Sequence, residues 1–284
     1  MPLDADFRPL AAGELLDRSF GIYRRLFTPL LLIQLLCVAP LLPFQLYLVA
    51  SGREQSPLYF LLVLASFVLS ALASAATARL ISESYLGREE RAGAALRGAV
   101  PMIGPLLLVS LGLGLVLMLS AMPAMLMMAG GAVVMVAAEG SSGGATSLLL
   151  TLAGFALLVL PVAAFAALSV ATPALIIERI GAGAALSRSW ALTRGSRLRV
   201  VGILLVVLVL IMIPFIGLGL LAAMLGLGGD TEGQQSILVL VLTYVVSILL
   251  TPWFYGVLTL LYYDFRVRRE GFDLEMLAQQ LGEA

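Results

Sequence analysis

The sequence has 284 residues, of which 61% are hydrophobic and only 12% are charged, and its formal net charge is zero. A soluble domain keeps roughly a quarter of its residues charged, so this composition excludes a chain folded entirely in water. Every basic residue is an arginine and histidine is absent, which excludes catalytic triads, Cys-His pairs and histidine zinc sites. We therefore expect an all-α polytopic membrane protein, not an enzyme, with no metal, no cofactor and no nucleic-acid partner.

The segment before the first apolar run predicts an amphipathic helix. Between residues 10 and 26, Leu15 and Phe20 recur at helical spacing, while Arg18 and Arg24 occupy other faces. Such a helix suits the plane of the membrane interface. Acidic residues near the start differ from the basic start of a secretory leader, so we expect the first apolar run to remain as an anchor.

Six apolar runs are long enough to cross a bilayer, whose hydrocarbon core needs about 20 helical residues. The expected spans of this single membrane domain, residues 1–284, are residues 26–50, 58–80, 105–137, 147–177, 200–227 and 237–263. The third, fourth and fifth exceed the minimum, so they tilt, kink or contain pieces that do not span. Prolines within the spans predict bends, because proline lacks the backbone donor.

Arginine is distributed very unevenly between the connections. The short connections contain glycine, serine and acids, and they are residues 51–57, 138–146 and 228–236. The longer connections, residues 79–104 and 178–199, and both chain ends carry every arginine except Arg53. The positive-inside rule then predicts a bacterial inner-membrane protein with both termini and both long loops in the cytoplasm.

The sequence also repeats itself. Leu-Asp-Arg-Ser-Phe at residues 16–20 returns as Leu-Ser-Arg-Ser-Trp at residues 186–190, and Arg24 and Arg194 follow at the same offset. A weaker middle copy lies at residues 94–97. The pattern predicts three units, each a short cytoplasmic amphipathic helix followed by a transmembrane hairpin. The alternative is chance similarity in a chain rich in leucine, alanine and arginine.

The third amphipathic segment, residues 182–198, has a clear polar face. Leu186 and Trp190 alternate with Arg188 and Arg194 at helical spacing. An arginine-bearing helix with a tryptophan on its apolar side is typical of interfacial helices, and Trp190 is the expected anchor at headgroup depth.

Three acids near the ends of the even-numbered spans each have an arginine close in the sequence: Glu83 with Arg79, Glu178 with Arg179, and Asp264 with Arg266. One interpretation is interfacial ion pairs that end the helices. The other is a ring that lines a cavity or a partner surface on the cytoplasmic side. No ionisable residue lies at mid-membrane, which argues against a proton-coupled pump. The candidate interaction residues of this rim are Arg18, Arg24, Arg79, Glu83, Glu178, Arg179, Arg188, Trp190, Arg194, Asp264 and Arg266.

Polar and small residues within the spans predict contacts between helices. The polar ones are Gln34, Gln45, Ser66, Ser70, Ser74 and Thr77. Interhelical hydrogen bonds are the first expectation, and a water-filled or headgroup-binding groove is the alternative. The glycines expected to allow close helix packing are Gly112, Gly114, Gly217, Gly219, Gly226 and Gly228.

Three stretches carry a resemblance to a known family, and they are residues 13–24, 181–195 and 262–271. They resemble the membrane-domain family named after glycerophosphoryl diester phosphodiesterases and related six-helix bacterial membrane proteins. The resemblance implies the fold and the membrane location. Some relatives are fused to a phosphodiesterase domain that uses histidines and an acidic metal site, for which this chain has neither room nor histidine. The resemblance therefore carries over no catalytic residue.

These observations favour a non-enzymatic inner-membrane protein that acts at its cytoplasmic face. Its expected partners are membrane lipids, above all anionic headgroups that the arginines would attract, and a membrane or cytoplasmic protein that it scaffolds or regulates. The alternative function is a small transporter or permease subunit, since repeats and proline-broken spans are features of transporters.

Overall fold

The computed structural model describes residues 8–53, 55–88, 90–137, 141–227 and 237–271. Over these residues the chain is helical, with no strand. Six helical stretches are long and apolar enough to cross a membrane: Phe27–Ala50, Pro57–Tyr85, Ala92–Ala137, Gly144–Glu178, Arg197–Met224 and Ile237–Glu270. The predicted class, all-α with six spans, is confirmed. Residue 54 and residues 138–140, which belong to two predicted short connections, and the whole third connection, residues 228–236, lie outside the described residues.

The helices follow the predicted order of three units. The first unit contains α1 (Ala12–Arg25), α2 (Phe27–Cys37), the 3₁₀ turn η1 (Ala39–Leu41), α3 (Leu42–Ala50) and α4 (Pro57–Tyr85). The second contains α5 (Ala92–Ala99), η2 (Val100–Met102), α6 (Ile103–Ala137), α7 (Ser141–Leu157), α8 (Val159–Leu168) and α9 (Ala171–Glu178). The third contains α10 (Ala182–Thr193), α11 (Arg197–Met224) and α12 (Ile237–Glu270). In each unit a short helix precedes two spans.

Proline breaks two of the spans. New helices begin with Pro43 in the first turn of α3, Pro161 in that of α8 and Pro173 in that of α9. A proline in the first turn has no intrahelical donor to lose, so a helix restarts there at little cost. Pro123 and Pro252, in contrast, lie within the unbroken helices α6 and α12.

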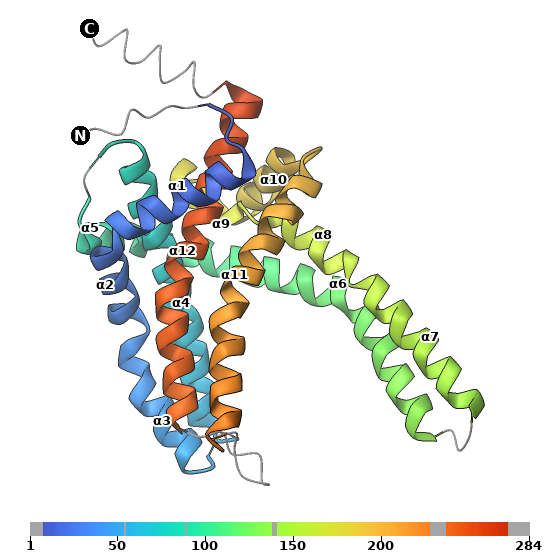
Figure 1. The fold of residues 1–284 in the computed structure, drawn as a ribbon. Coiled ribbons are helices and arrows are strands. Elements are labelled where there is room, and N and C mark those ends of the chain that lie inside the picture. The colour runs from blue at the N-terminus through green and yellow to red at the C-terminus, as the bar shows by residue number, and fades with distance from the viewer. Residues whose placement is uncertain (1–7, 54, 89, 138–140, 228–236, 272–284) are drawn as a thin grey trace, which may run out of the picture.

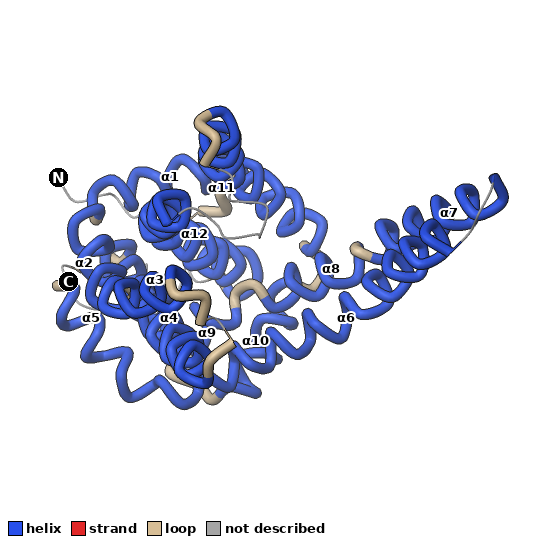
Figure 2. Tube along the Cα trace, turned by 90° about the horizontal axis from the view of Figure 1, so that it is seen from below, coloured by secondary structure: helices blue, strands red, loops and turns tan. Residues whose placement is uncertain are grey.

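The spans form a bundle and a separate arm. Figures 1 and 2 show α2, α3, α4, α11 and α12 side by side, whereas α6, α7 and α8 diverge from them. The most deeply buried large side chains, among them Tyr262, Tyr263 and Phe265 of α12, lie near the end of the bundle where α1 and α10 pack. Further along, the spans expose leucine, valine and methionine, which lipid solvates as readily as a helix neighbour does.

Two glycines let the two helices of the arm pack closely. A Cβ atom at Gly131 would lie 2.6 Å from Thr151 Oγ1, and one at Gly154 would lie 2.9 Å from the carbonyl of Ala124. Of the glycines that the prediction had named, Gly112 does lie close to a neighbouring helix, because a Cβ there would lie 3.1 Å from Leu186 Cδ1 of α10. A Cβ at Gly114, Gly217, Gly219 or Gly226 would meet nothing within 4 Å, so for those four the packing prediction was wrong, because spacing alone does not reveal which face meets a neighbour. Gly228 lies outside the described residues.

One predicted set of interhelical hydrogen bonds is present in the bundle. Gln45 Nε2 donates to Ser66 Oγ at 2.6 Å, and the hydroxyl of Tyr244 donates to Gln45 Oε1 at 2.7 Å. Gln45 therefore joins α3, α4 and α12. Ser74 donates to the carbonyl of Ala71 in its own helix, and its hydroxyl also hydrogen-bonds Tyr255 of α12.

Candidate functional site

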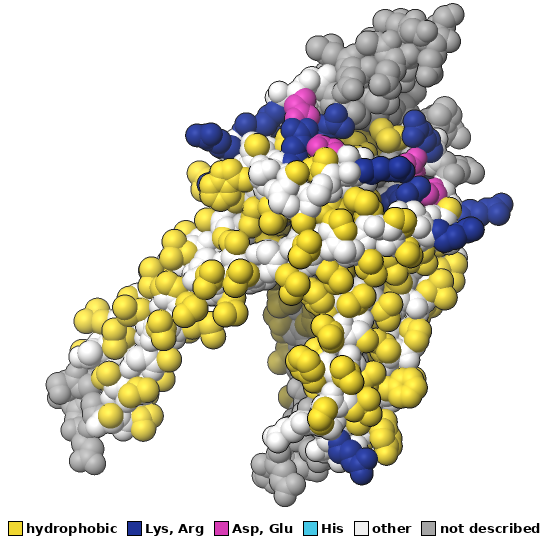
Figure 3. All heavy atoms as spheres, turned by 180° about the vertical axis from the view of Figure 1, so that it is seen from behind, with side chains coloured by type: hydrophobic (Ala, Val, Ile, Leu, Met, Phe, Trp, Pro, Cys, Tyr) yellow, Lys and Arg dark blue, Asp and Glu magenta, His cyan; other side chains and the backbone are white. Residues whose placement is uncertain are grey.

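Charged side chains gather at one end of the molecule. Figure 3 shows arginine and acidic side chains in a band above the apolar surface of the bundle and arm. We call this region the arginine face; it comprises α1, α5 and α10 with the adjoining ends of α4, α9, α11 and α12. All the candidate residues from the sequence belong to these elements or directly follow them, and Arg53 follows α3 at the other end of the first span.

The most buried charge of the arginine face is Asp264, in α12. Its side chain is fully buried. The carboxylate accepts hydrogen bonds from the backbone N–H of Leu10 at 2.8 Å, from Arg199 Nη1 at 2.5 Å and from Arg268 Nε at 2.9 Å. The two guanidinium groups also donate to the carbonyl of Leu10, at 2.5 and 2.7 Å. This Asp264 cluster therefore ties the segment before α1 to the start of α11 and the end of α12.

A second network joins three elements through Arg188 of α10. Arg188 Nε donates to Glu178 Oε1 at 2.8 Å, and its Nη2 donates to Glu270 Oε2 at 2.8 Å. Arg266 Nε donates to Glu270 at 3.1 Å, and the Tyr262 hydroxyl donates to Glu178 at 2.7 Å. The hydrogen bond with Glu270 is the main cause that raises the pKa of Arg188, against partial burial, and the bond with Glu178 adds to it. Arg188 therefore stays charged at every accessible pH.

A third network holds α5 against α4. Arg79 Nε donates to both oxygens of Glu90, at 2.9 and 3.2 Å. A Cβ atom at Gly98 would overlap the Arg79 guanidinium, so the ion pair needs a residue without a side chain at that position of α5. Glu83 has a looser contact with Arg88, at 3.6 Å, and Arg88 is largely exposed.

The partners of the acids differ from those that the sequence suggested. Arg79 bonds Glu90 rather than Glu83, and Glu178 bonds Arg188 rather than its neighbour Arg179. Arg179 lies beyond the end of α9, in a left-handed backbone conformation, and therefore does not face Glu178 along a helix. Arg79 and Glu83 share a face of α4, but Arg79 pairs with Glu90 in the connection that precedes α5. The expectation that the acids end their helices holds only for Glu178: α4 continues past Glu83 to Tyr85, and α12 continues past Asp264 to Glu270.

The other predicted residues lie on the same face. Arg24 is exposed on α1, where Arg18 is partly buried. Arg179 follows α9 with a left-handed backbone, φ 51°.

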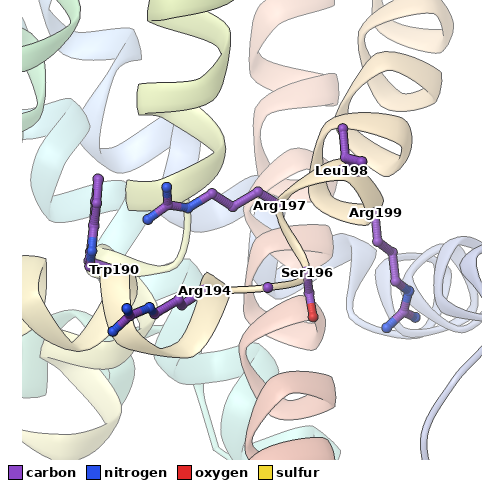
Figure 4. Close-up of a pocket in the computed structure, with 7 residues that line it drawn as sticks. Trp190, Arg194, Ser196, Arg197, Leu198 and Arg199 are labelled. Atoms are coloured by element: carbon purple, nitrogen blue, oxygen red, sulfur yellow. The ribbon is translucent and has the colours of Figure 1, made fainter.

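An open pocket of about 720 Å³ lies between the end of α10 and the start of α11, lined by Trp190 and residues 194–199. The guanidinium carbon of Arg197 lies 3.8 Å from the centre of the Trp190 ring. Figure 4 shows Arg194 and Arg197 extending toward Trp190, whereas Arg199 points away from it. Among the described residues, neither Arg194 nor Arg197 has a carboxylate partner, and Arg197 Nε is buried without a hydrogen bond. As far as the described ranges go, the pocket therefore carries positive charge that no carboxylate neutralises.

Sequence reasoning missed several residues that complete these sites. The acids Glu90 and Glu270 and the arginines Arg197, Arg199 and Arg268 were not among the candidates. Arg197 had a usable signal, since it is one of three arginines within six residues where an apolar helix begins. Arg268 also had a signal, because it lies four residues from Asp264 on the same helix face. Glu90, Arg199 and Glu270 instead have partners 11, 65 and 82 residues away, separations over which sequence spacing predicts no contact.

The chemistry available at the arginine face is recognition of anions. Guanidinium groups bind phosphate and carboxylate through paired donors, and a tryptophan at the interface tolerates both water and acyl chains. Within the described ranges, no three histidine, cysteine, aspartate or glutamate side chains are grouped so that they could hold a metal ion.

Comparison with known proteins gives a family and no closer relative. No curated protein and no solved structure matches the chain. A family model described as a domain of unknown function (DUF7847) matches residues 11–265, a range that begins just before α1 and ends near the end of α12. Because this match includes all three units, the chain belongs to the DUF7847 family.

Proposed function

We propose that the protein is a non-catalytic component of the bacterial inner membrane that interacts with anionic lipid through its arginine face. In this proposal both termini and the arginine face are cytoplasmic. The observation that carries it is the excess of arginine over acid among the residues that line the open pocket beside Trp190, next to spans that expose mainly apolar side chains. Each arginine near an anionic membrane surface contributes about 1 kcal/mol of attraction.

The geometry divides the arginines into two groups that support this proposal. Arginines 79, 188, 199 and 268 bond buried or half-buried carboxylates and hold elements together. Arginines 194 and 197 have no carboxylate partner among the described residues and border a pocket. The arginines of the first group are occupied in ion pairs that hold the fold together. The charges of Arg194 and Arg197 remain available to a ligand.

The lipid part of the proposal is tested by reconstituting the full chain into nanodiscs of phosphatidylcholine, with and without phosphatidylglycerol. We expect a higher unfolding temperature with phosphatidylglycerol and a smaller difference in high salt, because salt screens exposed charges. Equal unfolding temperatures in the two lipids at low salt would contradict the proposal.

The orientation is tested separately by labelling single cysteines with a membrane-impermeant thiol reagent in intact cells, in a Cys37→Ser background. Ser51 follows α3 and Ser187 is exposed on α10, at opposite ends of the spans. We expect Ser51→Cys to react from outside and Ser187→Cys to react only after lysis. The reverse pattern would place the arginine face outside.

Transport is the second candidate function, and one observation favours it. A pocket of about 320 Å³ among α4, α6, α8, α9 and α12 is lined partly by the hydroxyl-bearing residues Ser70, Ser74, Ser110, Thr172 and Tyr255. Ser70 lies nine residues from Arg79 along α4, about 14 Å into the membrane from the arginine face. If the protein transports a solute, water must reach this depth.

The kinship with the glycerophosphoryl diester phosphodiesterase membrane domains stays a prediction from the sequence. It adds no catalytic residue to the proposal, because its motifs at residues 13–24, 181–195 and 262–271 correspond to helical elements of the arginine face.

A further inference from the structure

The polar pocket at Trp190 and an apolar slot lie along the same face of α11. Arg197 is in the first turn of this helix, and Val201, Leu204, Leu208 and Ile211 follow at spacings of four, three, four and three residues. These spacings place all five side chains on one side of a helix. The face that begins at the arginine pocket therefore continues into the hydrocarbon region as an apolar stripe.

The slot itself lies between α8 and α11, where the arm diverges from the bundle (Figure 1). It has a volume of about 410 Å³, and Pro161, Val162 and Phe165 of α8 face Leu204 and Leu208 of α11. Its lining is almost entirely apolar.

Hydrogen bonds fix the pocket relative to the slot. Ser189 and Thr193 of α10 both donate to the carbonyl of Ala167, near the end of α8, at 3.0 and 3.1 Å. Trp190 lies between these two donors in the sequence. The hydrogen bonds therefore hold α10, which carries the Trp190 side of the pocket, against α8, which forms one wall of the slot.

The dimensions match one leaflet of a bilayer. Val201 and Ile211 are ten residues apart, which is about 15 Å along a helix and half of the roughly 30 Å hydrocarbon core. Arg197 lies four residues beyond Val201, about 6 Å further out, at the depth of the headgroups. The arginine therefore lies at the depth of a phospholipid's phosphate, and the slot lies at the depth of its acyl chains.

The charges at the pocket favour an anion. Ser196 precedes α11 without a side-chain cap, so the first backbone N–H groups of the helix, at residues 197–199, remain available as donors. An N-terminus of a helix attracts negative charge, and here it adds to Arg194 and Arg197. Arg269 also lies close, with Nη2 3.4 Å from the position of a Cβ at Gly195.

We infer that the pocket and the slot together bind one anionic glycerophospholipid. Its phosphate lies against Arg194, Arg197 and the first turn of α11, and an acyl chain lies between α8 and α11. The inference rests on the proposed function and gives it a site. A partner helix is a poorer occupant, because 15 Å of a helix about 10 Å wide fills roughly 1,200 Å³, about three times the slot.

Native mass spectrometry of the purified full chain tests this site. The protein is titrated with phosphatidylglycerol, with phosphatidylcholine and with glycerol 3-phosphate, and the bound adducts are counted. We expect wild-type protein to bind phosphatidylglycerol more tightly than phosphatidylcholine. Glycerol 3-phosphate is expected not to displace the lipid, since it lacks the acyl chain.

A first pair of variants tests whether the lipid binds at the Trp190 pocket in particular or responds to the positive charge of the whole arginine face. We expect Arg194→Gln with Arg197→Gln to weaken phosphatidylglycerol binding about 30-fold, the loss of two arginine contacts. The control replaces Arg91, which directly precedes α5, and Arg97 of α5 by glutamine on the same face, and it is expected to have little effect. If the double variant misfolds, Arg194→Gln alone serves as the test, because Arg194 is exposed. We expect this single replacement to weaken phosphatidylglycerol binding about fivefold.

A second pair tests the slot. Leu208→Trp fills it and should weaken both lipids, whereas Leu210→Trp, on another face of α11, should change neither. An unchanged affinity in Leu208→Trp, or displacement by glycerol 3-phosphate, would overturn the slot as the acyl site.

The outcomes also distinguish this site from the proposed function. Equal losses in the α10–α11 variant and the α5 control would overturn the site, while phosphatidylglycerol binding by the wild type would leave the proposed function standing. If wild-type protein shows no preference for phosphatidylglycerol over phosphatidylcholine, the lipid site and the proposed function are both contradicted.

Discussion

Replacement of Asp264 by asparagine should destabilise the protein more than any other single change to the arginine face. The carboxylate is the common acceptor for Leu10, Arg199 and Arg268, and its side chain is 0% exposed. Asparagine keeps one acceptor oxygen but turns an amide group toward a guanidinium. Two positive charges then face each other around the carbonyl of Leu10 without a compensating negative charge.

The magnitude follows from the burial of each partner. Removing one member of a buried ion pair costs about 3–5 kcal/mol. Arg199 and Arg268 have side chains 25% and 35% exposed, so water solvates them in part. We therefore expect a loss near the lower limit, about 3 kcal/mol. The matched control, Glu83→Gln, removes an acid whose partner is 72% exposed at 3.6 Å and should cost at most about 1 kcal/mol.

Equilibrium unfolding in mild detergent with a denaturing detergent titration measures both variants. Hydrogen exchange supplies a local readout: in Asp264→Asn the amides of α1 should lose protection, because the cluster fixes the chain at Leu10 just before that helix. An equal loss of stability in Asp264→Asn and Glu83→Gln would refute the argument from burial.

Two further changes test the arm and the transport alternative. Gly154→Ala should separate α6 from α7 and cost about 1–3 kcal/mol, because its Cβ would press on backbone, whereas Gly114→Ala, with open space, should be neutral or stabilising in the same unfolding measurement. Ser70→Cys in a Cys37→Ser background should resist a water-soluble thiol reagent that labels Ser51→Cys rapidly; comparable rates at both positions would favour a solvated transport path.

Much of the fold could be predicted from the sequence because membrane burial acts on local composition. A run of about 20 apolar residues must become a helix in lipid, where an unpaired backbone group is costly. The span predicted as residues 237–263 accordingly lies within one helix, α12 (Ile237–Glu270). Its far end runs on to Glu270 because ion pairs with Arg188 and Arg266 support the last charged turns.

The contacts of the arginine face depend instead on the tertiary fold. Asp264 meets Leu10 across 254 residues and Arg199 across 65. No spacing rule connects such pairs, so the sequence identified the acids as candidates but not their partners. The divergence of the arm could not be predicted either, because an apolar helix has the same composition whether it faces lipid or another helix.

The most direct test of the central claim is a photo-crosslink from the arginine face in native membranes. Leu198 borders the Trp190 pocket and is 89% exposed, so a benzoylphenylalanine at this position samples whatever lies against the pocket. In bacterial cells we expect the full-length protein to gain the mass of a phospholipid, and the yield to fall when Arg194 and Arg197 are replaced by glutamine. A crosslink to a polypeptide, with no lipid adduct, would contradict the claim that this face binds lipid.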